Sequence, residues 1–250
     1  FCRDAGPMVP GVDAIGGCMN KALVVRNLIY SYPDGRAALK GVDLELEQGM
    51  RLCLAGPNGS GKTTLFLNID GLLDGKGHIE IMGVVRSAKT ISDMRKMVGF
   101  LFSQVEHQFI MTDLLNDIIL SVGDEAADIA EKKKKALEWL KRFDLTRYAD
   151  TNPLELSAGE MKRAALAGVL ARRPELLLFD EPLGGLDREN GEKLTAILRS
   201  LSTTMLIATH RRFMVEEVAT HVAVMKEGKI TGFYEKKKAL KMRNVQDLLF

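Results

Sequence analysis

The chain has 250 residues, of which 46% are hydrophobic and 27% are charged, proportions close to the average for a globular protein. A chain of this length can bury a sizeable core without disulfides or structural metals. Its 35 Lys and Arg residues nearly balance its 33 Asp and Glu residues, so the net charge is +2. This balance argues against a dedicated nucleic-acid binder and against a disordered polyelectrolyte.

The cysteines and the first residues indicate where the protein works. Cys2, Cys18 and Cys53 have no metal-ligand spacing, which favours free thiols in a reducing compartment. No apolar run approaches the ~20 residues that cross a bilayer, and residues 1–19 lack the apolar stretch of a secretory signal. We therefore expect residues 1–19 to be a flexible leader, and membrane association to be peripheral and to come through a partner.

Short apolar strands alternate with helices along the chain. The strands are predicted at residues 22–30, 41–47, 51–55, 79–82, 98–102, 176–179 and 205–208, and the last two, at 222–225 and 229–233, are expected to finish a small sheet. Helices are predicted at 63–72, 157–171 and 191–201, in a polar stretch at 113–148, and in the basic tail 235–250. This alternation is typical of an α/β protein whose mainly parallel sheet is covered by helices on both faces. The polar stretch is expected to be an inserted helical subdomain, with its run Glu131–Lys135 a solvated helix face rather than a partner patch.

A glycine-rich loop joins the strand at 51–55 to the helix that follows it. It matches GxxxxGK[ST] over Gly56, Pro57, Asn58, Gly59, Ser60, Gly61, Lys62, Thr63 and Thr64. Glycines let successive backbone N–H groups turn toward phosphate oxygens, and the following helix directs its positive end at the same anion. We expect Lys62 to reach the β- and γ-phosphates, Thr63 to ligate Mg²⁺ and Thr64 to donate to the α-phosphate.

Two acids end the apolar strand at 176–179. Asp180 has the position of a Mg²⁺ ligand, directly or through water, and Glu181 that of a general base for an attacking water. For this pair alone, an acidic turn after a buried strand is an equal alternative. Beside a phosphate-binding loop, the functional roles are favoured.

The segment Leu156–Glu160 opens the helix at 157–171. Ser157 and Glu160 have the spacing of a capping box, in which each side chain binds the backbone N–H of the other residue. With Gly159 in its first turn, the same helix start also offers exposed N–H groups to an anion. A second phosphate-binding segment in one chain suggests that two chains share one nucleotide.

His210 follows the strand at 205–208. Ligands of doubly wound sheets bind beyond the carboxyl ends of the strands. The glycine loop, the Asp180–Glu181 pair and His210 are all predicted at such ends. We therefore expect His210 to contact the γ-phosphate rather than to be a structural histidine.

Together these motifs resemble those of the ATP-binding-cassette ATPases, over about residues 22–233 and in the same order. LSAGE resembles the signature of that family, and LLLFDEP resembles its Mg²⁺ and base strand. The resemblance implies that Asp187 lies in the loop that crosses the dimer interface and that His210 is the switch histidine. It also implies that Tyr32 stacks on adenine, with an ordinary strand tyrosine as the alternative.

The resemblance implies a P-loop NTPase fold spanning residues 20–233, with a small antiparallel β subdomain and a helical subdomain at about 105–172, followed by a basic tail at 234–250. It implies a head-to-tail dimer with two ATP molecules and Mg²⁺, each ATP lying between the glycine loop of one chain and Ser157 and Gly159 of the other. ATP closes the dimer, and hydrolysis opens it and moves membrane-spanning partner subunits. A homodimer, or a heterodimer with a second ATPase subunit, would then lie on the cytoplasmic face of the cell membrane.

Two positions depart from the pattern of the family. Ser103 stands where the family has a glutamine that contacts Mg²⁺ and hinges the helical subdomain. We hypothesise that a one-residue shift lets Gln104 fill that role, with a weakened hinge as the alternative. Ala158 replaces a signature glycine, but its methyl group is small, so we expect function to survive.

Within the family, FLFSQVEHQF and the segment from LSAGE to LLLFDEP look most like the cobalt/nickel and vitamin energy-coupling-factor importers. Two alternatives belong to other functional classes. A soluble ATPase of this superfamily in DNA repair, chromosome structure or translation would need a coiled coil, a zinc site or a second cassette. A nucleotide sensor without hydrolysis is suggested only by Ser103, and Glu181 and His210 argue against it.

Overall fold

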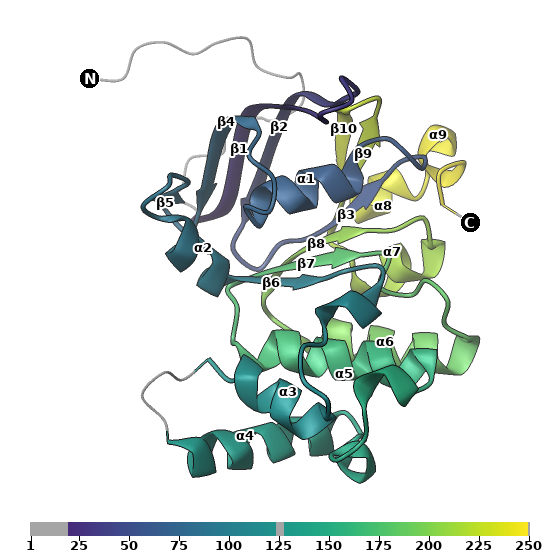
Figure 1. Cartoon of the computed structure of the whole chain (residues 1–250). Coiled ribbons are helices and arrows are strands. Elements are labelled where there is room, and N and C mark those ends of the chain that lie inside the picture. The colour runs from purple at the N-terminus through teal and green to yellow at the C-terminus, as the bar shows by residue number, and fades with distance from the viewer. Residues whose placement is uncertain (1–19, 124–127, 250) are drawn as a thin grey trace.

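The computed structural model describes residues 20–123 and 128–249 (Figure 1). The predicted leader at 1–19, with Cys2 and Cys18, lies outside the described residues. The strands are β1 (Lys21–Ser31), β2 (Ala37–Glu47), β3 (Arg51–Ala55), β4 (Lys76–Ile81), β5 (Val84–Val85), β6 (Val98–Leu101), β7 (Leu176–Asp180), β8 (Thr204–Ala208), β9 (His221–Lys226) and β10 (Lys229–Glu235). The helices are α1 (Lys62–Ile69), α2 (Ile91–Met97), α3 (Leu114–Ser121), α4 (Ile129–Arg142), α5 (Ala158–Ala171), α6 (Arg188–Ser200), α7 (Arg212–Val218), α8 (Lys236–Ala239) and α9 (Arg243–Gln246).

Two sheets enclose helix α1 (Figure 1). A four-stranded antiparallel sheet has the order β2-β1-β4-β5, and a six-stranded sheet has the order β10-β9-β3-β8-β7-β6. The pairs from β9 through β3, β8 and β7 to β6 are all parallel. This confirms the predicted α/β class. The expectation that β9 and β10 finish a separate small sheet is wrong, because β9 pairs with β3 and extends the main sheet.

The central strands bury both faces, as expected for a parallel sheet between two layers. On β7, Leu176 and Leu178 face the core around α1. Leu177 and Phe179 face the second core, which is formed with α3, α5, α6 and α7. Successive side chains of a strand point to opposite faces, so one continuous apolar run contributes to both cores. The loops that follow the central strands therefore start from backbone that is packed between two cores.

Cys53 on β3 is fully buried and free. Burial raises the pKa of its thiol to about 12, with Lys236 opposing the shift and Glu181 adding to it. A thiol in this environment stays protonated and unreactive at neutral pH.

We expect Leu206→Ala on β8 to lower the free energy of unfolding by about 2–5 kcal/mol, because Leu206 is fully buried and its loss leaves a cavity. Urea unfolding measures the effect. Leu72→Ala is the matched control, since Leu72 is 50% exposed, and we expect it to cost less than about 0.5 kcal/mol. Equal losses for the two variants would contradict this position of β8 in the core.

The predicted helix at 63–72 ends at Ile69, because the chain turns at Gly71 with a φ of 80°. The predicted strand at 79–82 ends at Ile81, because Met82 and Gly83 both adopt left-handed backbone and turn the chain into β5. Helices α2 and α7 were not predicted from the pattern, since each has only seven residues. A helix of seven residues makes only about two turns. Its sequence is therefore too short to show a clear helical hydrophobic period, and it is hard to distinguish from a loop by pattern alone.

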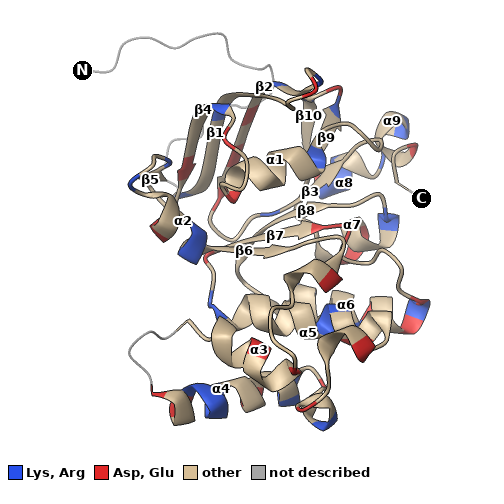
Figure 2. Ribbon diagram, viewed as in Figure 1, with Lys and Arg blue, Asp and Glu red and all other residues tan. Residues whose placement is uncertain are grey.

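The predicted polar helical stretch contains the helices α3, which ends at Ser121, and α4, which begins at Ile129. Asp113 and Asp128 cap them by accepting hydrogen bonds from Asn116 N and Glu131 N. They pack below α5 on the side of the main sheet away from α1, and Lys and Arg residues line α4 (Figures 1 and 2). Among the described residues, no helix is long and apolar enough to cross a membrane.

The tail predicted to be helical forms α8 and α9. Its apolar side chains Ala239, Val245 and Leu249 are buried in the same core as α5 and α6. The tail therefore packs against one side of the domain, and Lys237, Lys238 and Lys241 are exposed.

Candidate nucleotide-binding site

The carboxyl ends of three adjacent strands bring the predicted motifs together. Strands β3, β8 and β7 are neighbours and parallel. They lead into the glycine loop, into His210 and into the Asp180–Glu181 pair respectively. A parallel sheet places its ligand sites at this edge.

The glycine loop has a left-handed backbone, which favours glycine, at two positions. Gly59 and Gly61 have φ values of 79° and 109°. A Cβ at Gly61 would lie 2.8 Å from the carbonyl oxygen of Ala38, and one at Gly56 would lie 2.2 Å from that of Met225. The loop is thus packed closely between β2 and β9. Its glycines allow this close approach and also the left-handed backbone.

Lys62 is the first residue of α1, and its side chain is 7% exposed. Its Nζ donates to the carbonyl oxygens of Gly56 at 2.7 Å and Pro57 at 3.1 Å. Burial lowers the pKa of Lys62, while the nearby carboxylates of Glu181 and Asp180 raise it. The ammonium group is therefore held inside the loop, where it can meet an anion.

The side chains of Thr63 and Asp180 contact each other beside the glycine loop. Thr63 Oγ1 donates to Asp180 Oδ2 at 2.7 Å. Burial raises the pKa of Asp180, and the hydrogen bond from Thr63 opposes that rise. A hydroxyl and a carboxylate at this distance are the oxygen donors that Mg²⁺ takes alongside substrate phosphates.

Glu181 and His210 form the second polar pair. His210 Nδ1 and Glu181 Oε1 are 2.9 Å apart. Glu181 has a φ of 47°, a left-handed backbone that a non-glycine residue adopts at a cost of about 1–3 kcal/mol. Glu181 lines the same cavity as residues of the glycine loop.

Two buried polar atoms at this site have no hydrogen-bond partner among the described residues: Glu181 Oε2 and Ser60 Oγ. Native proteins rarely leave such atoms unsatisfied, unless a ligand or water supplies the partner. Among the described residues, no cluster of His, Cys, Asp and Glu could hold a metal alone. The oxygen atoms at this site therefore fit a phosphate ligand whose own oxygen atoms supply part of the Mg²⁺ coordination.

One cavity of about 240 Å³ is lined by part of the glycine loop, by Asp180 and Glu181, and by Tyr32 and Arg36, whereas Ser60 and His210 are not among its lining residues. Tyr32 OH and Thr64 Oγ1 are 2.9 Å apart, and the Arg36 guanidinium lies 4.8 Å from the centre of the Tyr32 ring. Arg36 is a cavity residue that belongs to none of the sequence motifs. Its only sequence signal is that it closes the turn after Tyr32.

The predicted capping box of α5 is present. Ser157 Oγ is 2.5 Å from Glu160 Oε2 and accepts from Glu160 N at 3.4 Å, and Ser157 N donates to Glu160 Oε2 at 3.0 Å. Hydrogen bonds from Ser157 and from the Tyr148 hydroxyl lower the pKa of Glu160 to about 2. No residue of α5 is among those lining the cavity at the glycine loop. Ser157 is exposed, so this helix start is available to a second molecule.

Asp187 caps α6 and is connected to α5. Its Oδ1 accepts from Asn190 N at 2.8 Å and its Oδ2 accepts from Asn190 Nδ2 at 2.9 Å. Arg163 donates to Asn190 Oδ1 at 2.7 Å, and Asn190 packs against the backbone of Gly159. Sequence reasoning missed Asn190, because its role depends on packing between two helices that are distant in the chain.

We expect Gly159→Ala to destabilise the protein by about 1–3 kcal/mol in urea unfolding, because its new methyl group overpacks the site. The Cβ would lie 2.6–2.9 Å from the side chain of Asn190, which Asp187 and Arg163 hold in place. Gly191→Ala is the matched control: nothing lies within 4 Å of its Cβ position, and helix propensity favours alanine by about 0.5–1 kcal/mol. A stabilising effect at both positions would contradict the tight contact.

Gln104 precedes the 3₁₀ turn η1 (Val105–Gln108) and is exposed, as is Ser103. The side chain of Gln108 instead binds the end of β6: its Oε1 accepts from Phe102 N at 2.9 Å and its Nε2 donates to Phe100 O at 2.8 Å. Gln108 is therefore committed to the backbone, and the role assigned to Gln104 stays a prediction.

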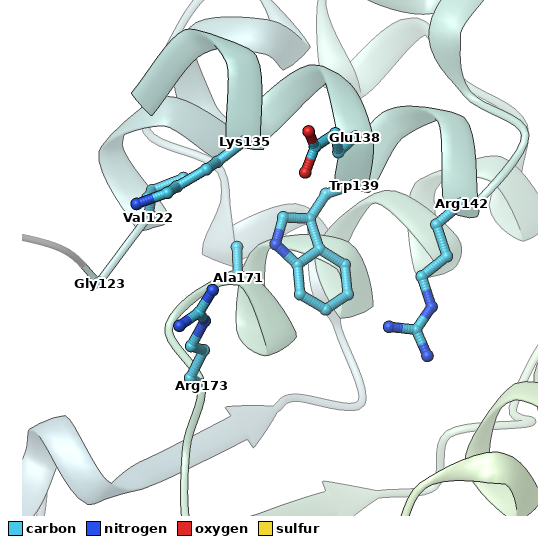
Figure 3. Close-up of a pocket in the computed structure, with 8 residues that line it drawn as sticks. All are labelled: Val122, Gly123, Lys135, Glu138, Trp139, Arg142, Ala171 and Arg173. Atoms are coloured by element: carbon cyan, nitrogen blue, oxygen red, sulfur yellow. The ribbon is translucent and has the colours of Figure 1, made fainter. Parts of the chain in front are cut away.

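Another pocket lies between α4 and the end of α5 (Figure 3). Trp139 forms its wall, with Arg142 5.2 Å from the ring centre and Arg173 opposite. It contains none of the residues predicted for the site.

The comparisons with known proteins agree with this geometry. The sequence model of the ABC transporter family matches residues 39–184. The chain therefore belongs to the ABC transporter family. Its features are those of the ATP-binding and ATP-hydrolysing subunit, which confirms the predicted class and favours transport over a role in DNA repair or translation.

Relatives and solved structures cover most of the chain. A putative ABC transporter ATP-binding protein of Gloeobacter violaceus is 41% identical over 86% of this chain and 89% of its own. The energy-coupling factor transporter ATP-binding protein EcfA of Methanosphaera stadtmanae is 34% identical over 85% and 78%. A solved CbiO subunit from Clostridium perfringens, part of the CbiONQ transporter complex, has a TM-score of 0.77 with 31% identity, covering 90% of this chain and 93% of its own. A dimeric ATP-binding cassette bound to ADP and Pi has a TM-score of 0.78 with 27% identity, covering 86% and 98%.

Proposed function

We propose that two copies of this chain bind two ATP molecules, each between the glycine loop of one copy and the start of α5 in the other. The observation that carries the proposal is the incomplete cavity. It gathers the glycine loop with Asp180 and Glu181 but lacks any residue of α5, while Ser157 at the start of α5 is exposed. A second copy supplies the missing wall, as the dimeric form of a related cassette suggests.

The glycine loop holds the triphosphate in this arrangement. Its backbone N–H groups and the start of α1 bind the phosphate oxygens. Lys62 pairs with the β- and γ-phosphates, and Thr64 donates to the α-phosphate. Tyr32 stacks on the adenine, with Arg36 on its other side or displaced by the base. The unsatisfied Ser60 Oγ gains a partner.

Thr63 and Asp180 would hold Mg²⁺, with Gln104 as a further ligand. Bound there, the ion neutralises charge on the phosphate oxygens. The hydroxyl of Thr63 and the carboxylate of Asp180 are already placed against each other at 2.7 Å. To bind the ion, Thr63 and Asp180 would give up the hydrogen bond between them and each contact the ion instead.

Glu181 acts as the general base in hydrolysis. Its left-handed backbone and its contact with His210 hold one carboxylate oxygen in place, and its other oxygen has no partner among the described residues. That free oxygen accepts the proton of the attacking water. Ser157 and Gly159 of the opposite copy close the site, so loss of the γ-phosphate removes what joins the two copies and the dimer opens.

We expect Gln104→Ala to lower the apparent Mg²⁺ affinity of the ATPase roughly tenfold or more, the range for residues of a metal shell. Ser103→Ala is the matched control, because Ser103 is the exposed neighbour and is too short to replace the amide. ATPase rates over a Mg²⁺ titration measure the effect. Wild-type activity of Gln104→Ala at every Mg²⁺ concentration would remove Gln104 from the site.

The partner is a multi-span membrane protein, and relatives indicate its type. The EcfA and CbiO relatives are named as parts of energy-coupling-factor and CbiONQ transporters. We therefore place this chain on the cytoplasmic face of the membrane as the ATPase of an importer of that kind, for a cobalt/nickel or vitamin cargo. Co-expression with a membrane protein encoded beside its gene tests this. A stable complex with stimulated ATPase activity is expected, and a chain that never binds that protein would contradict it.

A further inference from the structure

Lys162 is a buried cation that the proposed reaction leaves without a role. It lies on the second turn of α5, and only 5% of the residue is exposed. Burial lowers its pKa, while Glu181 and Glu106 raise it and Arg211 adds to the lowering. Burying an ammonium group is costly unless polar atoms compensate, so its partners indicate what the residue does.

Those partners are backbone carbonyls of the loop that carries the general base. Lys162 Nζ lies 3.3 Å from the carbonyl oxygen of Glu181 and also donates to that of Gly184. The Glu181 carbonyl oxygen accepts from Gly184 N at 2.9 Å as well. The ammonium group therefore holds the backbone at both ends of the turn that follows β7.

This turn needs such a fastening, because its backbone is unusual. Glu181 and Gly185 have φ values of 47° and 72°, so neither strand nor helix hydrogen bonds continue through it. A left-handed glutamate persists only where the surroundings hold it. Glu181 N donates to Ala208 O at 2.9 Å on one side. On the other side, Lys162 is the charged contact.

We propose that Lys162 is a positioning residue that holds the backbone of Glu181, so that the carboxylate of its own chain points at the attacking water. The inference rests on the proposed function. Lys162 touches no reacting atom; it acts through the carbonyl groups of Glu181 and Gly184. It also joins that loop to α5, whose start closes the site on the opposite copy.

Mixed dimers test the proposal, because α5 and Glu181 of one chain serve different nucleotides. In the reference dimer, one copy carries Glu181→Gln and the other is unchanged, so one site hydrolyses ATP. Lys162→Met is then placed either in the copy with the intact base or in the Glu181→Gln copy. Two affinity tags isolate each mixed dimer, and kcat and KM for ATP are measured.

We expect Lys162→Met in the copy with the intact base to give a turnover ~10–100-fold below that of the other placement, the effect of a misplaced catalytic group. KM for ATP should differ little between the two placements, because the glycine loop is untouched. Lys162→Arg keeps the donors and should restore most of the turnover. Equal turnover in the two placements, or a larger loss when the change is in the Glu181→Gln copy, would overturn the proposal, because Lys162 would then only shape α5.

Controls separate this from folding defects and from failure of the proposed function. Lys193→Met removes an exposed lysine that pairs with Glu189 at 2.7 Å and should behave like the reference. If Lys162→Met is insoluble, Lys162→Gln takes its place, with a shorter and uncharged donor group, and the same asymmetry is expected. A reference dimer that neither forms nor hydrolyses ATP would count against the shared site itself, whatever the role of Lys162.

Discussion

Glu181→Gln is expected to hydrolyse ATP ~10²–10⁴-fold more slowly than the wild type while still binding it, because a positioned general base contributes about that factor. The amide keeps the size of the carboxylate and can still contact His210, but it cannot take a proton. Lys62, Thr63 and the glycine loop are unchanged, so the affinity for ATP should be retained.

Steady-state phosphate release and nucleotide titration measure these two properties separately. Glu175→Gln is the matched control: Glu175 is an exposed acid just before the same strand, β7, and its loss should leave both properties unchanged. Wild-type turnover in Glu181→Gln would show that another group takes the proton.

Lys62→Ala is expected to weaken ATP binding by ~10–100-fold, because a hydrogen bond to a charged group contributes about 1.5–3 kcal/mol. Its ammonium group lies inside the glycine loop, 2.7 Å from the Gly56 carbonyl oxygen, and on binding it exchanges carbonyl contacts for phosphate oxygens. The methyl group of alanine leaves the phosphates with backbone donors only.

Calorimetric titration with a slowly hydrolysed ATP analogue gives the dissociation constants. Lys89→Ala, at an exposed lysine, is the control and should bind as the wild type does. If Lys62→Ala kept the wild-type affinity, the loop would not be the phosphate-binding element.

The motifs that carry chemistry were predictable because each is local. A strand, a glycine loop and a helix start are contiguous in the chain, so Lys62 and Thr63 are placed by the backbone that they belong to. The same holds for Asp180 and Glu181 at the end of β7. Because the strands that carry them are parallel neighbours, the motifs also converge as predicted.

The residues that sequence reasoning missed act across elements that are distant in the chain. Lys162 reaches a loop about twenty residues later, and Asn190 packs against Gly159 only because α6 lies on α5. Arg36 covers Tyr32 through the geometry of a turn. A hydrophobic pattern indicates that a residue is buried, but it does not indicate which distant part of the chain that residue contacts. The position of β9 beside β3 was missed for the same reason.

Light scattering on Glu181→Gln with and without saturating ATP and Mg²⁺ tests the shared site most directly. The proposed shared site predicts a monomer without nucleotide and a particle of twice that mass with it, and Ser157→Arg should prevent the change by blocking the start of α5. A protein that stays monomeric at saturating ATP would contradict the sharing of one nucleotide by two copies.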